Sequence, residues 1–334
     1  MIRLAACLLA VIVLAGCGGT RQVREPDVVV GGSPTPASTG EGEEEGGGGR
    51  IDIWVITHGQ ASSAFWTIVR NGVDAASRQT DVQVTYRSPD IYNVETMREL
   101  IDDAVNARPD GLVVSIPSEE LTPSIRRAVK TGIPTVSINS GSDIARRIGT
   151  LAHIGQPERE AGYQAGRRLA RAGANDALCV NQEIGNVGLD RRCAGFARAM
   201  RESGGTSNVI AIDTQNLDLA QQRLRTAATR PGVDGVLTLG LDAAELAIEV
   251  APVGATLGTF DYSPAVLRAV RTGRIEFAVD QQPYLQGYLP VVFLAERARY
   301  GLFPAQGKVV PTGPNFITAE NAAQAERLSL QGIR

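Results

Sequence analysis

The feature that most constrains the fold is a repeated alternation of short apolar runs with amphipathic helical segments. The run at 51–56 reads Ile-Asp-Ile-Trp-Val-Ile, and in the segment 65–77 after it apolar residues recur every three or four positions. Alternation at this spacing is typical of parallel βαβ units. We predict the next strands at 82–86, 112–116 and 135–138, with helices at 94–106 and 123–130 between them.

The alternation starts again after His153-Ile154-Gly155, with a long helix expected at 158–172. Further strands are expected near 177–180, 209–212, 236–239 and 256–260, and helices beginning near Leu189, Leu219, Ala243 and Pro264. Two such arrays predict an α/β fold of two doubly wound parallel-sheet lobes. Open parallel sheets bind ligands at the carboxyl ends of their strands. We therefore expect a solute between the lobes, with hinge closure around it.

The N-terminus has the features of a secretory signal over residues 1–16. Arg3 precedes an apolar run from Leu4 to Leu14 that is too short for a permanent membrane span. The run ends in Leu14-Ala15-Gly16-Cys17, which resembles the bacterial lipobox and implies lipidation of Cys17. The protein is then extracytoplasmic and anchored to the cell membrane. The alternative is a secreted protein without lipid.

Residues 17–49 are expected to form a disordered tether. They contain Ser-Pro-Thr-Pro, three consecutive glutamates and four consecutive glycines. A segment of this composition cannot bury enough apolar surface to offset the entropy lost on ordering. The formal net charge of −3 for the whole chain gives no indication of nucleic-acid binding.

Two of the four cysteines remain in the expected globular part. Cys7 lies in the signal and Cys17 is the lipid site, which leaves Cys179 and Cys193. In an oxidising compartment this pair predicts a disulfide, although sequence does not fix whether the backbone permits the required separation. Only His58 and His153 could join the two cysteines in a metal site, so we expect no metal.

Polar residues follow most of the predicted strands. Amides and isolated carboxylates at these positions suit vicinal hydroxyls, whereas an anionic ligand would need clustered Arg or Lys. Two adjacent aromatic residues, Phe65 and Trp66, suit the apolar face of a sugar or cyclitol ring, although one or both could instead belong to the core. Taken singly, the polar residues are also common as helix caps or turn residues. The candidate ligand-binding residues are Ser63, Phe65, Trp66, Asn139, Asp190, Arg191, Asn216, Asp242, Asp261 and Gln281.

Several motifs together resemble the ribose-binding-protein family of type I periplasmic binding proteins, over about residues 51–316. They are Ser63-Ala64-Phe65-Trp66 with Arg70-Asn71-Gly72, Asp110-Gly111-Leu112, Gly132-Ile133-Pro134-Thr135-Val136, His153-Ile154-Gly155, Arg192-Cys193-Ala194-Gly195-Phe196, and Phe260-Asp261 followed by Gln281.

The resemblance implies a sugar-binding role for Phe65, Trp66, Asp261 and Gln281, and a monomer that delivers its solute to ABC permease subunits. It also implies three crossovers between lobes, with residues 51–153 and 283–311 in the first lobe and 154–282 and 312–334 in the second. The chain departs from the family at Asn139-Ser140, at Gly240-Leu241, and at Asp190, where an arginine is common and Arg191 is the nearest substitute. The identity of the sugar or cyclitol therefore stays open.

The two alternative functions are an enzyme and a ligand sensor. An enzyme is disfavoured because the sequence has no Gly-x-Gly-x-x-Gly after the first strand, no P-loop and no Gly-x-Ser-x-Gly. We therefore expect no cofactor and interpret His58, beside Ser62 and Ser63, as a hydrogen-bonding loop residue. A ligand sensor that presents its sugar-bound form to a membrane receptor or kinase would use the same fold and stays open.

Overall fold

The first of two sheets is parallel throughout and has the strand order β11-β5-β4-β3-β1-β2. The computed structural model describes residues 50–59 and 63–333. The strands are β1 (Asp52–Ile56), β2 (Gln83–Arg87), β3 (Gly111–Ser115), β4 (Thr135–Ile138), β5 (Ala152–Gly155) and β11 (Lys308–Pro311).

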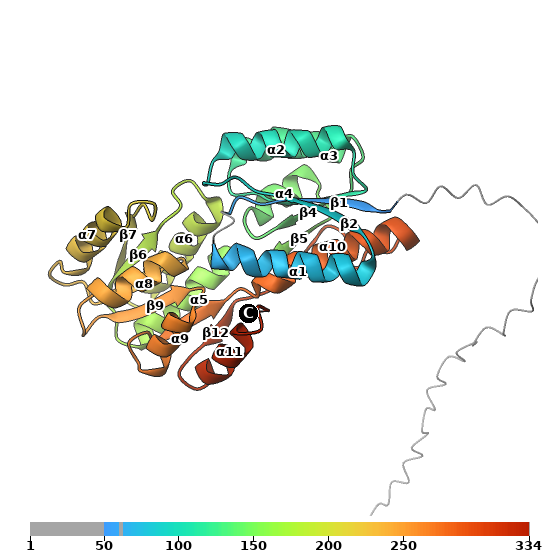
Figure 1. The fold of residues 1–334 in the computed structure, drawn as a ribbon. Coiled ribbons are helices and arrows are strands. Elements are labelled where there is room, and N and C mark those ends of the chain that lie inside the picture. The colour runs from blue at the N-terminus through green and yellow to red at the C-terminus, as the bar shows by residue number, and fades with distance from the viewer. Residues whose placement is uncertain (1–49, 60–62, 334) are drawn as a thin grey trace, which may run out of the picture. The chain divides into compact units, whose positions relative to one another are not determined.

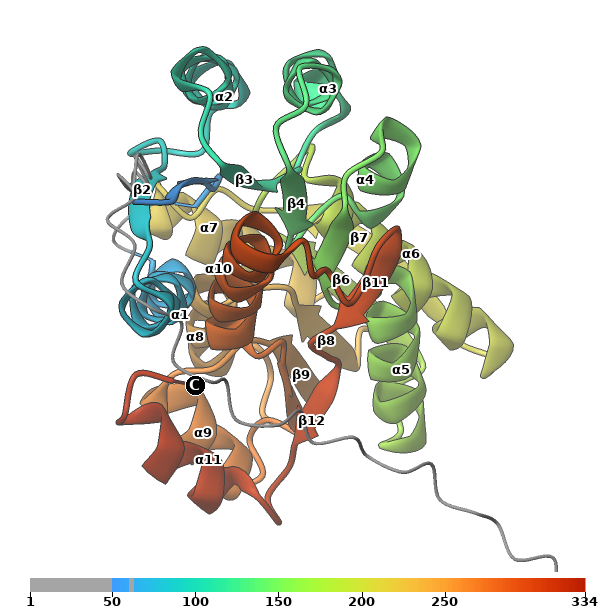
Figure 2. The ribbon, with the colours of Figure 1, turned by 90° about the vertical axis from the view of Figure 1, so that its right-hand side faces the viewer.

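Helices cover both faces of this first sheet (Figures 1 and 2). α2 (Val94–Ala107), α3 (Thr122–Lys130) and α4 (Ser142–Ile148) bury Met97, Ile125 and Ile144 on one face. α1 (Ala64–Thr80) and α10 (Pro283–Tyr300) bury Val69 and Leu294 on the other. A 3-10 turn, Glu119–Leu121, precedes α3. The central strand β3 is buried along its whole length, as its branched apolar run requires.

The second sheet has the order β12-β10-β9-β8-β6-β7, and β12 runs antiparallel to β10. The strands are β6 (Asp176–Asn181), β7 (Thr206–Ala211), β8 (Gly235–Thr238), β9 (Thr256–Phe260), β10 (Phe277–Asp280) and β12 (Asn315–Ile317). One face is covered by α5 (Glu158–Arg171) and α6 (Val187–Glu202). The other is covered by α7 (Leu217–Ala228), α8 (Leu241–Val250), α9 (Pro264–Arg271) and α11 (Ala322–Ser329).

The chain passes between the two sheets after β5, again after β10 through α10, and a third time between β11 and β12. The fully buried Gln286 of α10 ties two of these passages together. Its Nε2 donates to Gln281 O at 3.0 Å and to Thr312 Oγ1 at 3.2 Å, and its Oε1 accepts from Asn139 Nδ2 at 3.1 Å.

The predicted fold class, two doubly wound α/β lobes, is confirmed. The expected lobe boundaries remain a prediction, and β5 continues to Gly155, past the expected boundary at 153. No position for α4, β10, β11, β12 or α11 was predicted. β11 and β12 pair with strands far away in the chain, and local apolar periodicity does not reveal such a pairing.

Candidate ligand-binding site

Two polar residues occupy equivalent positions in the two sheets. Asn139 directly follows β4 and Asp261 directly follows β9, and both have a left-handed backbone, with φ of 61° and 63°. Each backbone N–H donates to the neighbouring strand, to Ile154 O at 3.0 Å and to Val279 O at 2.9 Å. Asn and Asp tolerate this conformation better than most residues. Both residues line one cavity, so the two halves each contribute a polar side chain at the same strand-end position.

Asp261 is connected to the floor of the cavity by hydrogen bonds. Gln281 Nε2 donates to Asp261 Oδ1 at 2.7 Å, and Gln281 Oε1 accepts from Arg192 Nη2 at 2.8 Å. Because both ends of the amide are engaged, the orientation of Gln281 is fixed. Burial raises the pKa of Asp261 to about 7, against the opposing effects of the Arg192 charge and the Gln281 hydrogen bond.

The charge of the Arg192 guanidinium is neutralised by the carboxylate of Glu158. Its Nε donates to Glu158 Oε2 at 2.5 Å and its Nη2 to Glu158 Oε1 at 2.9 Å, and the two side chains are 2% and 3% exposed. The guanidinium also lies over the Phe260 ring at 4.5 Å. A two-point contact of this kind is the strong geometry for Arg and carboxylate.

Two glycines permit this ion pair. A Cβ at Gly162 of α5 would lie 2.0 Å from Arg192 O, and a Cβ at Gly195 of α6 would lie 1.9 Å from Arg159 O. Only hydrogen fits at these positions, so α5 and α6 approach closely enough for the side chains at 158 and 192 to pair.

A cluster of aromatic side chains forms another part of the cavity lining. Trp66 meets the rings of His58 and Phe65 edge-on, with centroid separations of 4.8 and 5.1 Å. Trp66 is 6% exposed and packs into the core of the first sheet, whereas Phe65 is half-buried. A Cβ at Gly59 would lie 1.6 Å from Trp66 Cδ1, so the backbone at 59 supports the indole directly.

His58 is buried between the two halves. Its Nδ1 lies 2.8 Å from Ser115 Oγ and its Nε2 lies 3.7 Å from Glu183 Oε2. Burial lowers the pKa of His58, although the Glu183 charge opposes that shift. The ring is therefore neutral near pH 7.

The cavity has a volume of about 660 Å³, within the usual size of small-molecule sites. Its lining draws on loops at the carboxyl ends of strands in both sheets, as expected for this topology. The carboxyl groups in the lining belong to Glu183, Asp213, Asp242 and Asp261. Burial, together with repulsion from Glu245 and Glu183, raises the pKa of Asp242. Burial and nearby acidic groups also raise the pKa of Tyr92, to about 12.

A model of the family described as periplasmic binding protein domain matches residues 53–301, most of the chain. The chain belongs to this family. The match confirms the family resemblance that the sequence motifs indicated, and members of this kind are binding proteins rather than enzymes.

Similar proteins add detail. A solved carbohydrate transporter from Acidothermus cellulolyticus, in complex with myo-inositol, is 34% identical, covers 86% of this chain and 100% of its own, and superimposes with a TM-score of 0.80. A xylose/arabinose-binding protein from Sulfolobus acidocaldarius is 23% identical over 78% of this chain and 69% of its own length. A xylitol-binding protein from Mycolicibacterium smegmatis is 25% identical over 63% of this chain and 62% of its own length, so that match spans less than two thirds of the relative.

Most of the residues predicted from sequence meet at the cavity of this periplasmic binding protein. Those in its lining are Ser63, Phe65, Trp66, Asn139, Asp242, Asp261 and Gln281. Their contact with a ligand remains a prediction.

The structure places three predicted residues outside the lining. Asn216 is the N-cap of α7, where its Oδ1 accepts from Leu219 N. Asp190 accepts from Asn181 Nδ2, and Arg191 pairs with Asp143 of α4. Each of the three has a structural partner, and their contact with a ligand remains a prediction.

Other lining residues were not among the ten candidates. Gln215 lines the cavity in place of its neighbour Asn216, because α7 begins one residue after Asn216 and uses it as the cap. Arg192 belongs to one of the family motifs, and nothing local in the sequence shows that this helical arginine reaches the cavity lining. Tyr92 and Gln182 lie in loops with no distinctive pattern.

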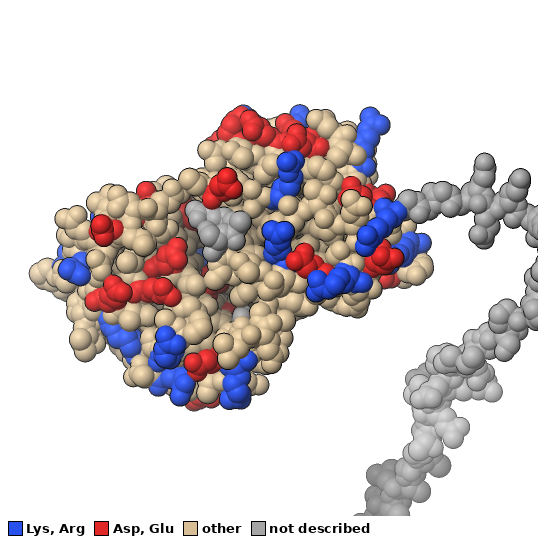
Figure 3. Space-filling view, in the orientation of Figure 1, with Lys and Arg blue, Asp and Glu red and all other residues tan. Residues whose placement is uncertain are grey.

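The predicted disulfide between Cys179 and Cys193 is present, with a Cα separation of 5.7 Å. Cys17, the signal and the tether lie outside the described residues. Among the described residues, no three or more His, Cys, Asp or Glu side chains gather as a metal site, and no helix has the length and apolar character needed to cross a membrane. On the face in Figure 3, acidic and basic side chains are interspersed.

Proposed function

We propose that this protein captures a neutral polyhydroxylated solute, a cyclitol or a monosaccharide, in the cavity between its two halves. The observation that carries the proposal is the pairing of Arg192 with Glu158 at a cavity whose other polar lining is mainly carboxyl and amide side chains, together with aromatic rings and aliphatic residues. Carboxylates and amides can bind several hydroxyl groups at once. An anionic ligand would meet a guanidinium whose charge is already neutralised, together with four carboxyl groups.

The ring contacts favour a cyclic ligand. The half-buried Phe65 ring, with Trp66 beside it in the lining, offers apolar area to the C–H face of a six-membered ring. The myo-inositol complex of the 34% identical relative supports a cyclitol as the first ligand to test, and the pentose- and xylitol-binding relatives support a wider group of polyols.

The captured solute is delivered to an ABC importer. On binding, the lobes at 51–153 with 283–311 and at 154–282 with 312–334 close by rotation about the three crossing segments. This role is supported by the family to which the chain and its relatives belong. It does not rest on any contact described above. The protein acts as a monomer, held at the outer side of the cell membrane by a lipid on Cys17 and the tether 17–49. Mass measurement of the N-terminal peptide of membrane-extracted protein tests the anchor, since a diacylglyceryl group on Cys17 has a defined added mass.

A thermal-shift panel tests ligand class. Ligand that binds only the folded state raises the melting temperature as its concentration exceeds Kd. We expect myo-inositol or a neutral pentose or hexose to raise it, and D-glucuronate and inositol phosphates to have little effect. A larger shift with the anionic compounds would contradict the proposal.

A further inference from the structure

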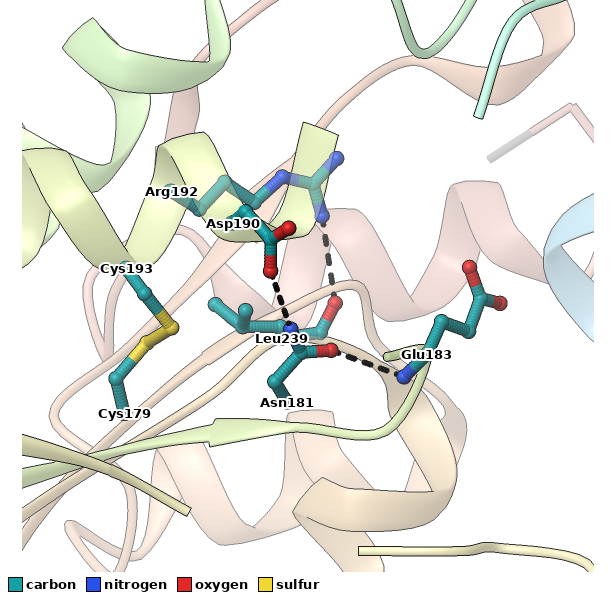
Figure 4. Close-up of a disulfide and its surroundings, with 7 residues drawn as sticks. All are labelled: Cys179, Asn181, Glu183, Asp190, Arg192, Cys193 and Leu239. Atoms are coloured by element: carbon teal, nitrogen blue, oxygen red, sulfur yellow. Dashed lines mark hydrogen bonds between the residues drawn. A yellow bond between two sulfur atoms is a disulfide. The ribbon is translucent and has the colours of Figure 1, made fainter. Parts of the chain in front are cut away.

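The Cys179–Cys193 disulfide joins the strand and the helix that flank one wall of the cavity. Cys179 lies in β6 and Cys193 in α6, fourteen positions apart, and both are buried (Figure 4). The chain between them, residues 180–192, leaves the end of β6, turns, and enters α6. The bond therefore closes the base of this segment.

The 180–192 segment supplies much of the second sheet's share of the cavity lining. Its lining residues are Gln182, Glu183, Ile184, Asn186, Leu189 and Arg192. They include the guanidinium that orients Gln281 and the carboxylate nearest His58. A change in the position of this segment would therefore alter the cavity wall and its charges together.

The same segment also contacts the first half of the molecule. Val187 N donates to Pro117 O at 2.9 Å, and Ser140 Oγ donates to Asn186 Oδ1 at 3.0 Å. The ion pair of Arg191 with Asp143 joins the halves in the same region, and His58 Nε2 lies 3.7 Å from Glu183 Oε2 there. The segment is thus shared between the ligand cavity and the contact that brings the halves together.

Inside the segment, short-range hydrogen bonds hold the turn. Asn186 Nδ2 donates to Glu183 Oε2 at 2.6 Å, Asn186 Oδ1 accepts from Gly188 N at 2.9 Å, and Asn186 N donates to Glu183 O at 3.1 Å. Asn181 Oδ1 accepts from Glu183 N at 2.9 Å, and Asn181 Nδ2 donates to Asp190 Oδ1 at 3.0 Å (Figure 4). Ile184 is 70% exposed, so it contributes little packing. Beyond the disulfide, α6 keeps its own core contacts through Phe196 and Met200, so the helix can remain folded without the bond.

We propose that the disulfide is a positioning device for the 180–192 segment, which it holds in the conformation that both binds ligand and contacts the first half. Loss of the bond increases the number of conformations that the turn samples before binding. Ordering the turn then costs ligand affinity. The affinity part of this inference rests on the proposed function, whereas the ordering of the segment does not.

The test uses the full-length mature chain with Cys179→Ala and Cys193→Ala together. A second pair, Cys179→Val with Cys193→Ala, refills volume at the strand in case the first pair folds poorly. Ile125→Ala, in the core of the first sheet, is the control for a general loss of stability. Hydrogen exchange is measured on ligand-free protein, and Kd for myo-inositol by calorimetry.

We expect exchange in residues 181–191 to accelerate in the cysteine variants while β1 and β3 keep their protection. We expect their Kd to rise about tenfold, with no such rise in Ile125→Ala at a similar melting temperature. Unchanged exchange in 181–191 would overturn the inference, as would an unchanged Kd in variants that have lost the bond. If the wild type binds no polyol, the proposed function fails, and the exchange experiment alone decides whether the disulfide positions the segment.

Discussion

Arg192, in the lining of the ligand cavity, forms a two-point ion pair with Glu158, and both side chains are almost inaccessible to water. The pair puts a guanidinium in the lining without leaving its charge available to an anion. It also gives Gln281 a fixed donor, and through Gln281 it sets the position of Asp261. A buried ion pair adds little net stability, but removal of one partner leaves an uncompensated charge and is costly.

Glu158→Gln is therefore expected to lower the free energy of unfolding by about 3 kcal/mol. It should also improve the binding of D-glucuronate relative to myo-inositol, because the Arg192 charge is no longer neutralised. Urea unfolding and competition calorimetry measure the two effects. The matched control is Glu202→Gln, which breaks an exposed pair with Arg198 and should leave the midpoint close to wild type. Equal stability of Glu158→Gln and wild type would contradict this account.

Phe65→Ala is expected to weaken ligand binding by about 1–3 kcal/mol with a smaller effect on folding. The ring is half-buried and lines the cavity, so its removal exposes little core. Calorimetry measures the affinity and thermal unfolding checks the fold. An unchanged Kd would place Phe65 outside the ligand contact.

Trp66→Ala is expected to affect folding more strongly than Phe65→Ala does, with a loss of about 3–5 kcal/mol in the free energy of unfolding. The indole is 6% exposed, packs with the core of the first sheet and supports His58 and Phe65. Affinity should fall as well, because Phe65 loses its neighbour. A variant as stable as wild type would show that the indole does not pack as described.

His153 should make stability fall in mild acid. Burial lowers its pKa to about 4, so the folded state holds a neutral ring while the unfolded chain titrates near 6.5. Between these values the unfolded state binds more protons, and the free energy of unfolding falls as pH drops from about 6.5 to 4, by roughly 3 kcal/mol in total.

The comparison with His153→Asn isolates this contribution. The amide can replace the contact between His153 Nδ1 and Ser137 Oγ, 2.9 Å in the wild type, but it does not titrate. Urea unfolding at steps from pH 7 to pH 4 should give a steeper fall for wild type than for the variant. Parallel curves would contradict the prediction.

The sequence predicted the βα arrays well because each long helix carries several turns of apolar periodicity. The predicted helix at 158–172 matches α5 to within one residue at its end. The short β11 and β12 were not predicted, because each depends on pairing with a strand far away in the chain, β5 for one and β10 for the other. No local pattern encodes such a pairing.

At the site, the ends of the predicted strands were the sequence feature that located lining residues. Asn139 and Asp261 were found because polar residues directly after buried strands lie at the carboxyl edge of a parallel sheet. Asn216 shows the limit of that rule, since a shift of one residue turns a lining position into a helix cap. Arg192 shows another, since its role depends on the close approach of α5 and α6 and on Glu158, which is 34 residues away in the chain.

The capture of a neutral polyol is tested most directly by titration calorimetry on protein unfolded, dialysed and refolded to remove any co-purified ligand. The titrants are myo-inositol, D-xylose, D-arabinose, xylitol and D-glucose, with D-glucuronate as the charged comparison. We predict that at least one neutral compound binds with a Kd below about 100 μM and more tightly than D-glucuronate. No binding by any neutral compound to refolded protein, or tighter binding of the anion, would contradict the account.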